Sequence, residues 1–226
     1  MSDSTIRPIT PRAFEDAHGM DDWRVLGDGA ACFFRTASFP ESARFVAALA
    51  ADATIAGHPP AVDVRHDGVT LRLVTASEDH FGMTELDVEV ARAIGAIARR
   101  LGLTADASVL QSILVVPGAP DTAAVFPFWR EVLGYQPRPD SPEEDLVDPG
   151  DRGPGFWFEA MDEPRGDGGG AIHIGVFVPH EVAESRVHAA LAAGGRMVRD
   201  AYAPHWWTLA DAAGNEADIG VIRDRE

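Results

Sequence analysis

The chain has 226 residues, of which 46% are hydrophobic and 24% charged, so it has ample apolar material for a buried core. Its 19 basic residues are all arginines and face 36 acidic residues, which gives a net charge of −17 (19 − 36). Without lysine, the sequence excludes a lysine Schiff base, a pyridoxal-phosphate lysine and a Walker A lysine. A chain this acidic repels phosphate backbones and anionic lipid, so neither nucleic acid nor a membrane is an expected partner.

The N-terminal residues and the cysteine content indicate the cellular compartment. The opening residues MSDSTIRPIT are too polar for a signal peptide, and the sequence contains no run of about 18 apolar residues. Cys32 is the only cysteine, which excludes an internal disulfide and a thiolate metal cluster. These features predict a cytoplasmic protein whose partner is a small-molecule substrate.

The charge distribution predicts two domains, 1–105 and 106–226. The first carries 10 arginines and 15 acidic residues, a net −5 (10 − 15), and the second carries 9 and 21, a net −12 (9 − 21). The boundary follows an amphipathic stretch, Ala91–Leu103, that ends in a Gly-containing stop. The first domain is therefore expected to be complete before the second begins.

In the first domain, apolar runs separated by turn residues predict two β-hairpins, and apolar residues at helical spacing predict two helices. In chain order these are a hairpin of Trp23–Leu26 with Ala31–Thr36, a helix from Pro40 through Ile55, a hairpin of Val62–Val64 with Val69–Leu73, and a helix from near Thr84. The pattern predicts an α+β fold, in which a four-stranded antiparallel sheet has helices on one face.

These segments resemble the pterin-4a-carbinolamine dehydratases over about residues 8–103. The resemblance is carried, in order, by Asp22–Leu26, Phe45 through Gly57-His58-Pro59, Asp63–Arg65, Val69–Thr75 and Gly82–Asp87. It implies a pterin ligand and the loss of water from 4a-hydroxytetrahydropterin, with histidines as general acid and base. Histidine suits this chemistry because its pKa lies near neutrality.

The site motif departs from the family pattern, in which a His-His-Pro motif, a later Thr-His and then an aspartate line the pterin site. Gly57 and Ala76 stand in place of two histidines, whereas His58 and Asp87 match the pattern. The loop before Asp87 is about two residues longer than in the family and carries His80. Either His80 reaches the site, which makes His58, His80 and Asp87 its catalytic groups, or the fold persists without the reaction.

The second alternative makes the first domain a non-catalytic binding or dimerisation module. Dehydratase relatives associate through sheet and helix surfaces, so the resemblance also implies a homodimer. On that interpretation, the first domain dimerises the attached second domain.

The second domain is predicted to consist of two similar βαβββ modules, which is the organisation of a repeat. The first module contains the strand Leu110–Val116, the helix Thr122–Leu133, and strands around Asp145–Val147 and Gly155–Met161. The second contains the strand Ile172–Val178, the helix Glu181–Ala193, and strands around Met197–Arg199, Trp206–Ala210 and Ala217–Ile222. A glycine run, Gly168-Gly169-Gly170, is expected to separate them.

This arrangement resembles the vicinal oxygen chelate superfamily, and within it the small glyoxalase-like proteins. The matching segments are Phe128–Tyr135, Ile172-His173-Ile174, and Trp206–Asp211 followed by Gly214-Asn215-Glu216. The resemblance implies a cup that holds a divalent metal through one residue from each of four strands, namely Gln111, Glu159, His173 and Glu216. One imidazole with oxygen donors suits Zn, Ni, Co, Mn or Fe.

Strand alternation places Trp157 on the same side as Glu159, and the aromatic-walled cup implies Trp157, His205 and Trp207 as substrate-binding residues. Glu216 or Glu159 is the candidate base, by resemblance to glyoxalase I. Two other interpretations remain open: His173 only forms hydrogen bonds within the cup, or a shift of one residue replaces Gln111 by Ser112. Because the second domain keeps all its ligand-competent residues, it is the expected functional part, a lyase or isomerase-like small-molecule enzyme.

Overall fold

A computed structural model describes residues 7–161, 172–210 and 216–222, and the chain divides into two compact units between Leu110 and Gln111. The expected glycine separator at 168–170 and the Asp211–Asn215 part of the Trp206 motif lie outside these residues. Within the described ranges, no helix is both long and apolar enough to cross a membrane. Each unit is described by itself.

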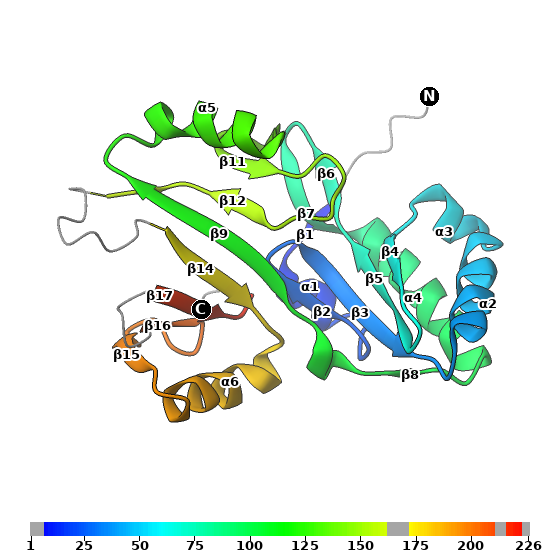
Figure 1. Ribbon diagram of the computed structural model, residues 1–226. Coiled ribbons are helices and arrows are strands. Elements are labelled where there is room, and N and C mark those ends of the chain that lie inside the picture. Colours follow the sequence, from blue (N-terminus) through cyan, green and yellow to red (C-terminus); the bar gives the residue numbers. More distant parts are fainter. Residues whose placement is uncertain (1–6, 162–171, 211–215, 223–226) are drawn as a thin grey trace. The chain divides into compact units, whose positions relative to one another are not determined.

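The first unit contains an antiparallel sheet of the predicted kind (Figure 1). Its strands run in the order β2 (Arg24–Leu26), β3 (Gly29–Arg35), β5 (Gly68–Leu73) and β4 (Ala61–Val64), and β8 (Thr104–Ala105) pairs with β3. A smaller sheet has the order β1 (Pro8–Ile9), β7 (His80–Thr84) and β6 (Thr75–Ser77). The helices are α1 (Pro11–Glu15), α2 (Phe39–Ala50), α3 (Ala53–Gly57), α4 (Glu85–Arg100) and the 3-10 helix η1 (Ala107–Val109).

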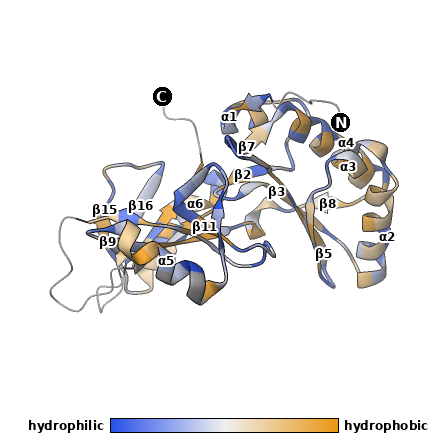
Figure 2. Ribbon diagram, turned by 90° about the horizontal axis from the view of Figure 1, so that it is seen from above, coloured by the Kyte–Doolittle hydropathy of each residue, from blue (hydrophilic) through white to orange (hydrophobic). Residues whose placement is uncertain are grey.

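The core of this unit forms where the apolar face of α2 meets β3 and β5. Every residue of β3 except Arg35 is buried, including Cys32. Phe34 of β3 meets Phe45 of α2 edge-on, with ring centroids 5.4 Å apart. Figure 2 shows α2 mostly in hydrophobic colours, in line with its apolar sequence. The predicted α+β arrangement is confirmed.

Two local predictions in this unit are wrong. The single helix expected from Pro40 through Ile55 is two helices, because the Asp52 side chain accepts hydrogen bonds from the backbone N–H groups of Thr54 and Ile55 and so begins α3. The stretch Ser77–Gly82, expected as a loop, is mostly strand. It belongs to the β6–β7 hairpin, in which Thr75 lies opposite Gly82 and Ser77 opposite His80.

The second unit is built on one nine-stranded sheet that joins two modules, each beginning with a strand followed by a helix. The second module is the predicted βαβββ unit, whereas the first has one strand more, because the segment expected as a single strand at Gly155–Met161 is divided into two short strands. The first module contains β9 (Ser112–Ala119), α5 (Thr122–Leu133), β10 (Gln136–Arg138), β11 (Ser141–Val147), β12 (Gly155–Trp157) and β13 (Glu159–Ala160). The second contains β14 (Ile172–Phe177), α6 (His180–Ala192), β15 (Arg196–Arg199), β16 (Trp206–Ala210) and β17 (Glu216–Gly220). The strand order β10-β11-β12-β9-β14-β17-β16-β15 places the first strands of the modules side by side.

Side-chain alternation divides this sheet into two faces. One face is apolar and packs on the helices. In the first module it forms a cluster of Phe126, Leu146, Phe156 and Phe158, and in the second a cluster of Val178, Ala183, Val187, Trp207, Leu209, Ile219 and Val221. The opposite face, here called the His173 face, carries Trp157, Val116, His173, Glu216, Asp218 and Thr208.

Candidate functional site

His58 and Asp87 meet in the first unit although 29 residues separate them in the sequence. His58 follows the last residue of α3, and Asp87 lies in the first turn of α4. Their side chains form a hydrogen bond of 2.8 Å between Nε2 of His58 and Oδ1 of Asp87. Asp87 is completely buried, whereas 22% of the His58 side chain is exposed. The carboxylate is therefore enclosed by protein, whereas part of the imidazole ring is accessible to solvent.

Three further donors hold the second oxygen of Asp87. Oδ2 accepts hydrogen bonds from the backbone N–H of Thr84 at 2.8 Å, the hydroxyl of Thr84 at 2.6 Å and the hydroxyl of Thr75 at 2.9 Å. The Thr84 contacts form a capping box that begins α4. With its other oxygen, Asp87 sets the orientation of the His58 ring, as carboxylates do for catalytic imidazoles. The Nδ1 atom of His58 remains for proton exchange with a ligand.

His80 lies on the same side of the β6–β7 hairpin as these two threonines. His80, Gly82 and Thr84 alternate along β7, and Gly82 lies directly opposite Thr75. The Nε2 atom of His80 is buried and has no hydrogen-bond partner among the described residues. His80 forms no hydrogen bond to His58 or Asp87 in the described part of the chain.

In the second unit, His173 is surrounded by carboxylates. Its Nε2 lies 3.4 Å from Oδ2 of Asp218, and its Nδ1 lies 3.9 Å from Oε2 of Glu159. Asp218 also accepts a hydrogen bond of 2.6 Å from the Thr208 hydroxyl. The hydrogen bond with Asp218 and the nearby carboxylates, including Glu216, raise the pKa of His173 against the opposing effect of burial.

The pKa of Asp218 is shifted the opposite way. Burial is the largest single effect and would raise the pKa of this carboxyl, but the hydrogen bonds from His173 and Thr208, together with the charges of His173 and Arg199, hold it below its usual value. The two opposite pKa shifts show that each group favours the charged form of the other. The side chains around His173 offer a ligand both a proton donor and several acceptors.

Gln111 does not join this group. It precedes β9, and Oε1 of Gln111 accepts a hydrogen bond of 3.4 Å from Arg186. In the β9–β14 register, His173 lies opposite Val116 and Phe177 opposite Ser112. Gln111 is therefore five residues along β9 from the level of His173, which is roughly 16 Å in an extended strand.

The four residues predicted as metal ligands are consequently not brought together. Glu159 and His173 lie close to each other, the register places Glu216 next to His173, and Gln111 is remote. The part of the chain that the structure describes holds no group of three His, Cys, Asp or Glu side chains arranged to bind a metal ion. The predicted donor set does not fit a four-ligand centre.

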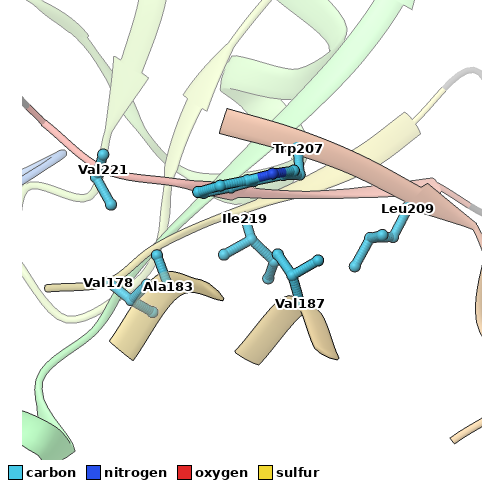
Figure 3. Close-up of a cluster of buried hydrophobic side chains, with 7 residues drawn as sticks. All are labelled: Val178, Ala183, Val187, Trp207, Leu209, Ile219 and Val221. Carbon is cyan, nitrogen blue, oxygen red and sulfur yellow. The ribbon is translucent and has the colours of Figure 1, made fainter. Parts of the chain in front are cut away.

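The three residues predicted to bind substrate, Trp157, His205 and Trp207, lie in different surroundings. Trp157 is 38% exposed on the His173 face. Trp207, in contrast, is only 8% exposed and packs against Ile219 and α6 (Figure 3). The prediction for Trp207 is wrong because alternation turns Trp207 toward the helix and Trp206 toward the His173 face. His205 is half-buried, and its backbone carbonyl accepts a hydrogen bond from Val221.

Sequence reasoning missed several residues that the structure places at these sites. For Asp218, the only signal in the sequence is its position two residues after Glu216, which places both side chains on the same face of a strand. Thr84 was missed although it precedes the predicted Asp87 by three residues, the spacing of a capping box, which is a usable signal. Thr75 and Trp206 gave no signal that distinguishes them from ordinary strand residues. Trp206 stacks on Tyr202, with ring centroids 4.2 Å apart.

Comparison with known proteins assigns both units. The family model described as "Pterin 4 alpha carbinolamine dehydratase" matches residues 7–97, and the one described as "Glyoxalase-like domain" matches residues 114–220. A protein of Chloroflexus aurantiacus named "Putative pterin-4-alpha-carbinolamine dehydratase" is 40% identical over 76 residues, which cover 34% of this chain and 80% of that protein. A protein of the same name from Acidobacterium capsulatum is 32% identical over 90 residues, covering 39% and 96%.

Among solved structures, a glyoxalase/bleomycin resistance protein/dioxygenase superfamily member from Vibrio splendidus matches 50% of this chain and 99% of its own. Its identity is 16% and its TM-score 0.33, values too low to assign a fold or a function. The family models and the named relatives are what decide the assignment. The chain belongs to the pterin-4a-carbinolamine dehydratase family through its first unit, and it joins that domain to a glyoxalase-like domain in its second.

Proposed function

We propose that the first unit removes water from a 4a-hydroxytetrahydropterin. The observation that carries this proposal is the hydrogen bond of 2.8 Å between His58 and the fully buried Asp87, within the family motif. In the reaction, a ring N–H loses its proton, a C=N bond forms at C4a, and the C4a–O bond breaks as the hydroxyl takes up a proton. One proton is removed and one is supplied, so no oxidant or reductant takes part.

The His58–Asp87 pair suits the removal of the ring proton. When Nε2–H of His58 donates to Asp87, Nδ1 carries a free lone pair and is the acceptor. The four hydrogen bonds to Asp87 keep this carboxylate from rotating, so the ring is preorganised before a substrate binds. A positioned general base of this kind accelerates proton transfer by about 10²–10⁴.

The test is the rate of dehydration of 4a-hydroxytetrahydropterin by the full chain. We expect wild-type activity well above buffer and a loss of at least about tenfold in His58→Ala, because a general acid–base group is removed. His66→Ala is the matched control, since His66 lies in the turn of the β4–β5 hairpin with its side chain 90% exposed. A wild-type rate no greater than that of buffer would contradict the proposal.

A second candidate function is the binding or turnover of a small molecule at the His173 face. The observation that favours it is the arrangement of Asp218 and Glu159 on either side of His173, with Trp157 exposed on the same face. An imidazole with acceptors beside it and an exposed indole near it is a common composition for ligand sites.

A thermal-shift measurement tests whether this second site binds a metal ion. The melting temperature of wild type and of Glu216→Ala is measured with Zn, Ni, Co, Mn and Fe(II) salts in turn. A ligand at a hundred times its dissociation constant stabilises the folded state by about 2.7 kcal/mol, which a thermal shift detects. A shift in wild type that Glu216→Ala abolishes would support a metal site. The absence of a shift with every salt would argue against metal binding at this face.

A further inference from the structure

We infer that His80 is the second proton-transfer group of the dehydratase site and supplies the proton that leaves with the hydroxyl. This inference rests on the proposed function of the first unit. It starts from an imbalance in that unit, because dehydration needs both an acceptor and a donor of protons and the His58–Asp87 pair supplies the acceptor. Gly57 and Ala76, which replace the other family histidines, cannot exchange protons.

The β6–β7 hairpin carries His80 to the side on which Asp87 is held. Thr75 and Gly82 lie directly opposite each other, and the Thr75 hydroxyl donates to Asp87 at 2.9 Å. Side chains directly opposite in antiparallel strands have Cβ atoms about 4.5–5.5 Å apart. His80 alternates with Gly82 and Thr84 on this same side of β7. The hairpin side that contacts Asp87 is therefore also the side that bears His80.

The His80 ring folds along the strand over Gly82. A Cβ atom built on Gly82 would lie 3.4 Å from Cε1 and 3.7 Å from Nε2 of His80. The ring thus lies beside Gly82, within ordinary van der Waals distance of the position a Cβ would take there, on the side of the hairpin that faces Thr75. Combined with the cross-strand spacing, this places the ring within roughly 13 Å of the Asp87 carboxylate, on the same side of the hairpin.

The Nε2 atom of His80 also lacks the partner that a structural histidine would have. It is buried and accepts or donates no hydrogen bond among the described residues. A buried polar atom left unpaired destabilises the folded state, so such atoms mark positions that a ligand or another group satisfies. A bound 4a-hydroxyl, as the acceptor of a proton from Nε2, would satisfy it.

The assignment completes the proton balance of the reaction. His58 takes the ring N–H proton on Nδ1 as the C=N bond forms. His80 gives the proton on Nε2 to the 4a-hydroxyl as the C4a–O bond breaks, and water leaves. Transfer of one proton back through solvent restores both imidazoles. The extended hairpin then explains how the chain dispenses with a histidine at position 76.

The test compares His80→Ala and His80→Gln with wild type in the dehydration assay on the full chain. Glutamine keeps hydrogen-bonding capacity but does not exchange protons, so we expect kcat to fall at least about tenfold in both variants with KM nearly unchanged. Added imidazole should restore part of the rate in His80→Ala only. His66→Ala, a histidine in the turn of the neighbouring hairpin, is the control and should match wild type.

The outcomes separate this inference from the function on which it rests. If wild type is active and His58→Ala is impaired while His80→Gln retains full kcat, the inference is overturned and the proposed function stands. If wild type is inactive, both are overturned. If a His80 variant unfolds, titration of wild type with 7,8-dihydropterin decides instead. A shift of the His80 Cε1–H resonance on binding supports the inference, and an unmoved resonance with His58 shifted overturns it.

Discussion

Gly57 is the position at which this chain departs most simply from its family motif. It is the last residue of α3, and a Cβ built on it meets no atom within 4 Å. Gly57→His would recreate a His-His-Pro sequence without a steric clash. We expect the free energy of unfolding to stay unchanged or to rise by about 0.5 kcal/mol, because glycine is a poor helix former. We expect faster pterin dehydration than in wild type.

Urea unfolding and the dehydration assay measure these two effects. Gly102→His is the control, because Gly102 is equally free of neighbours but has a φ of +72° that a histidine adopts only with strain. A loss of more than about 1 kcal/mol in Gly57→His, on the scale of ordinary destabilising mutations, would show that the site is not open.

Trp207 and Trp157 give a second prediction at the scale of single residues. Trp207 is part of the cluster between β16, β17 and α6, so Trp207→Ala should lower the free energy of unfolding by about 3–5 kcal/mol. Trp157→Ala should cost less than about 1 kcal/mol, because the side chain is partly exposed. Denaturant unfolding followed by circular dichroism measures both. Equal losses would contradict the assignment of Trp207 to the core and Trp157 to the surface.

Strands β14, β16 and β17 bring His173, Thr208 and Asp218 together, and we expect this contact to make the free energy of unfolding depend on pH. The pKa of His173 is raised, so its contribution to stability is complete below the pKa of an unfolded histidine and is lost as pH rises through the folded value. The pKa of Asp218 is lowered, so its contribution is present above the pKa of an unfolded aspartate and is lost as pH falls through the folded value. Both contributions are complete between about pH 4 and pH 6.5.

The measurement is the difference in unfolding free energy between wild type and Asp218→Asn across the pH range. We expect the largest difference in that mildly acidic window and a smaller one on either side. Thr208→Val serves as the matched variant, since it removes one hydrogen bond to Asp218 but keeps the carboxylate and its charge. A difference that keeps growing above pH 8 would contradict the pairing.

The whole molecule carries a net charge of −17, and this charge acts on stability at long range. Self-repulsion disfavours the compact state, and salt screens it, because the Debye length falls from about 30 Å at 0.01 M to about 8 Å at 0.15 M. We therefore expect the melting temperature to rise over this range of NaCl, by about 2–4 °C for each kcal/mol of stabilisation. KCl at equal ionic strength should act equally. A melting temperature that falls with added salt would contradict this account.

Much of the fold followed from the sequence because its signals are local. The bounds of α5 match the predicted helix, since Asp121 accepts a hydrogen bond from the N–H of Ala124 at its start and Gly134 adopts a φ of +66° after its end. The strands β2, β3, β5 and β4 of the first sheet and the two modules of the second unit follow from alternating apolar residues and short turns, whereas the short fifth strand of the first sheet, β8, gave no such pattern. Such patterns depend on neighbours within about four residues and are readable without a structure.

Only the tertiary structure decided which side chains meet. Strand register separates Gln111 from His173 and brings in Asp218 instead, and it turns Trp206 rather than Trp207 to the His173 face. The contact between His58 and Asp87 depends on how α3 and the start of α4 pack, and the place of His80 depends on a hairpin that looked like a loop. A shift of one residue reverses a strand's faces, and pairing depends on residues far apart in the chain, so the sequence by itself determines the elements while packing determines the site.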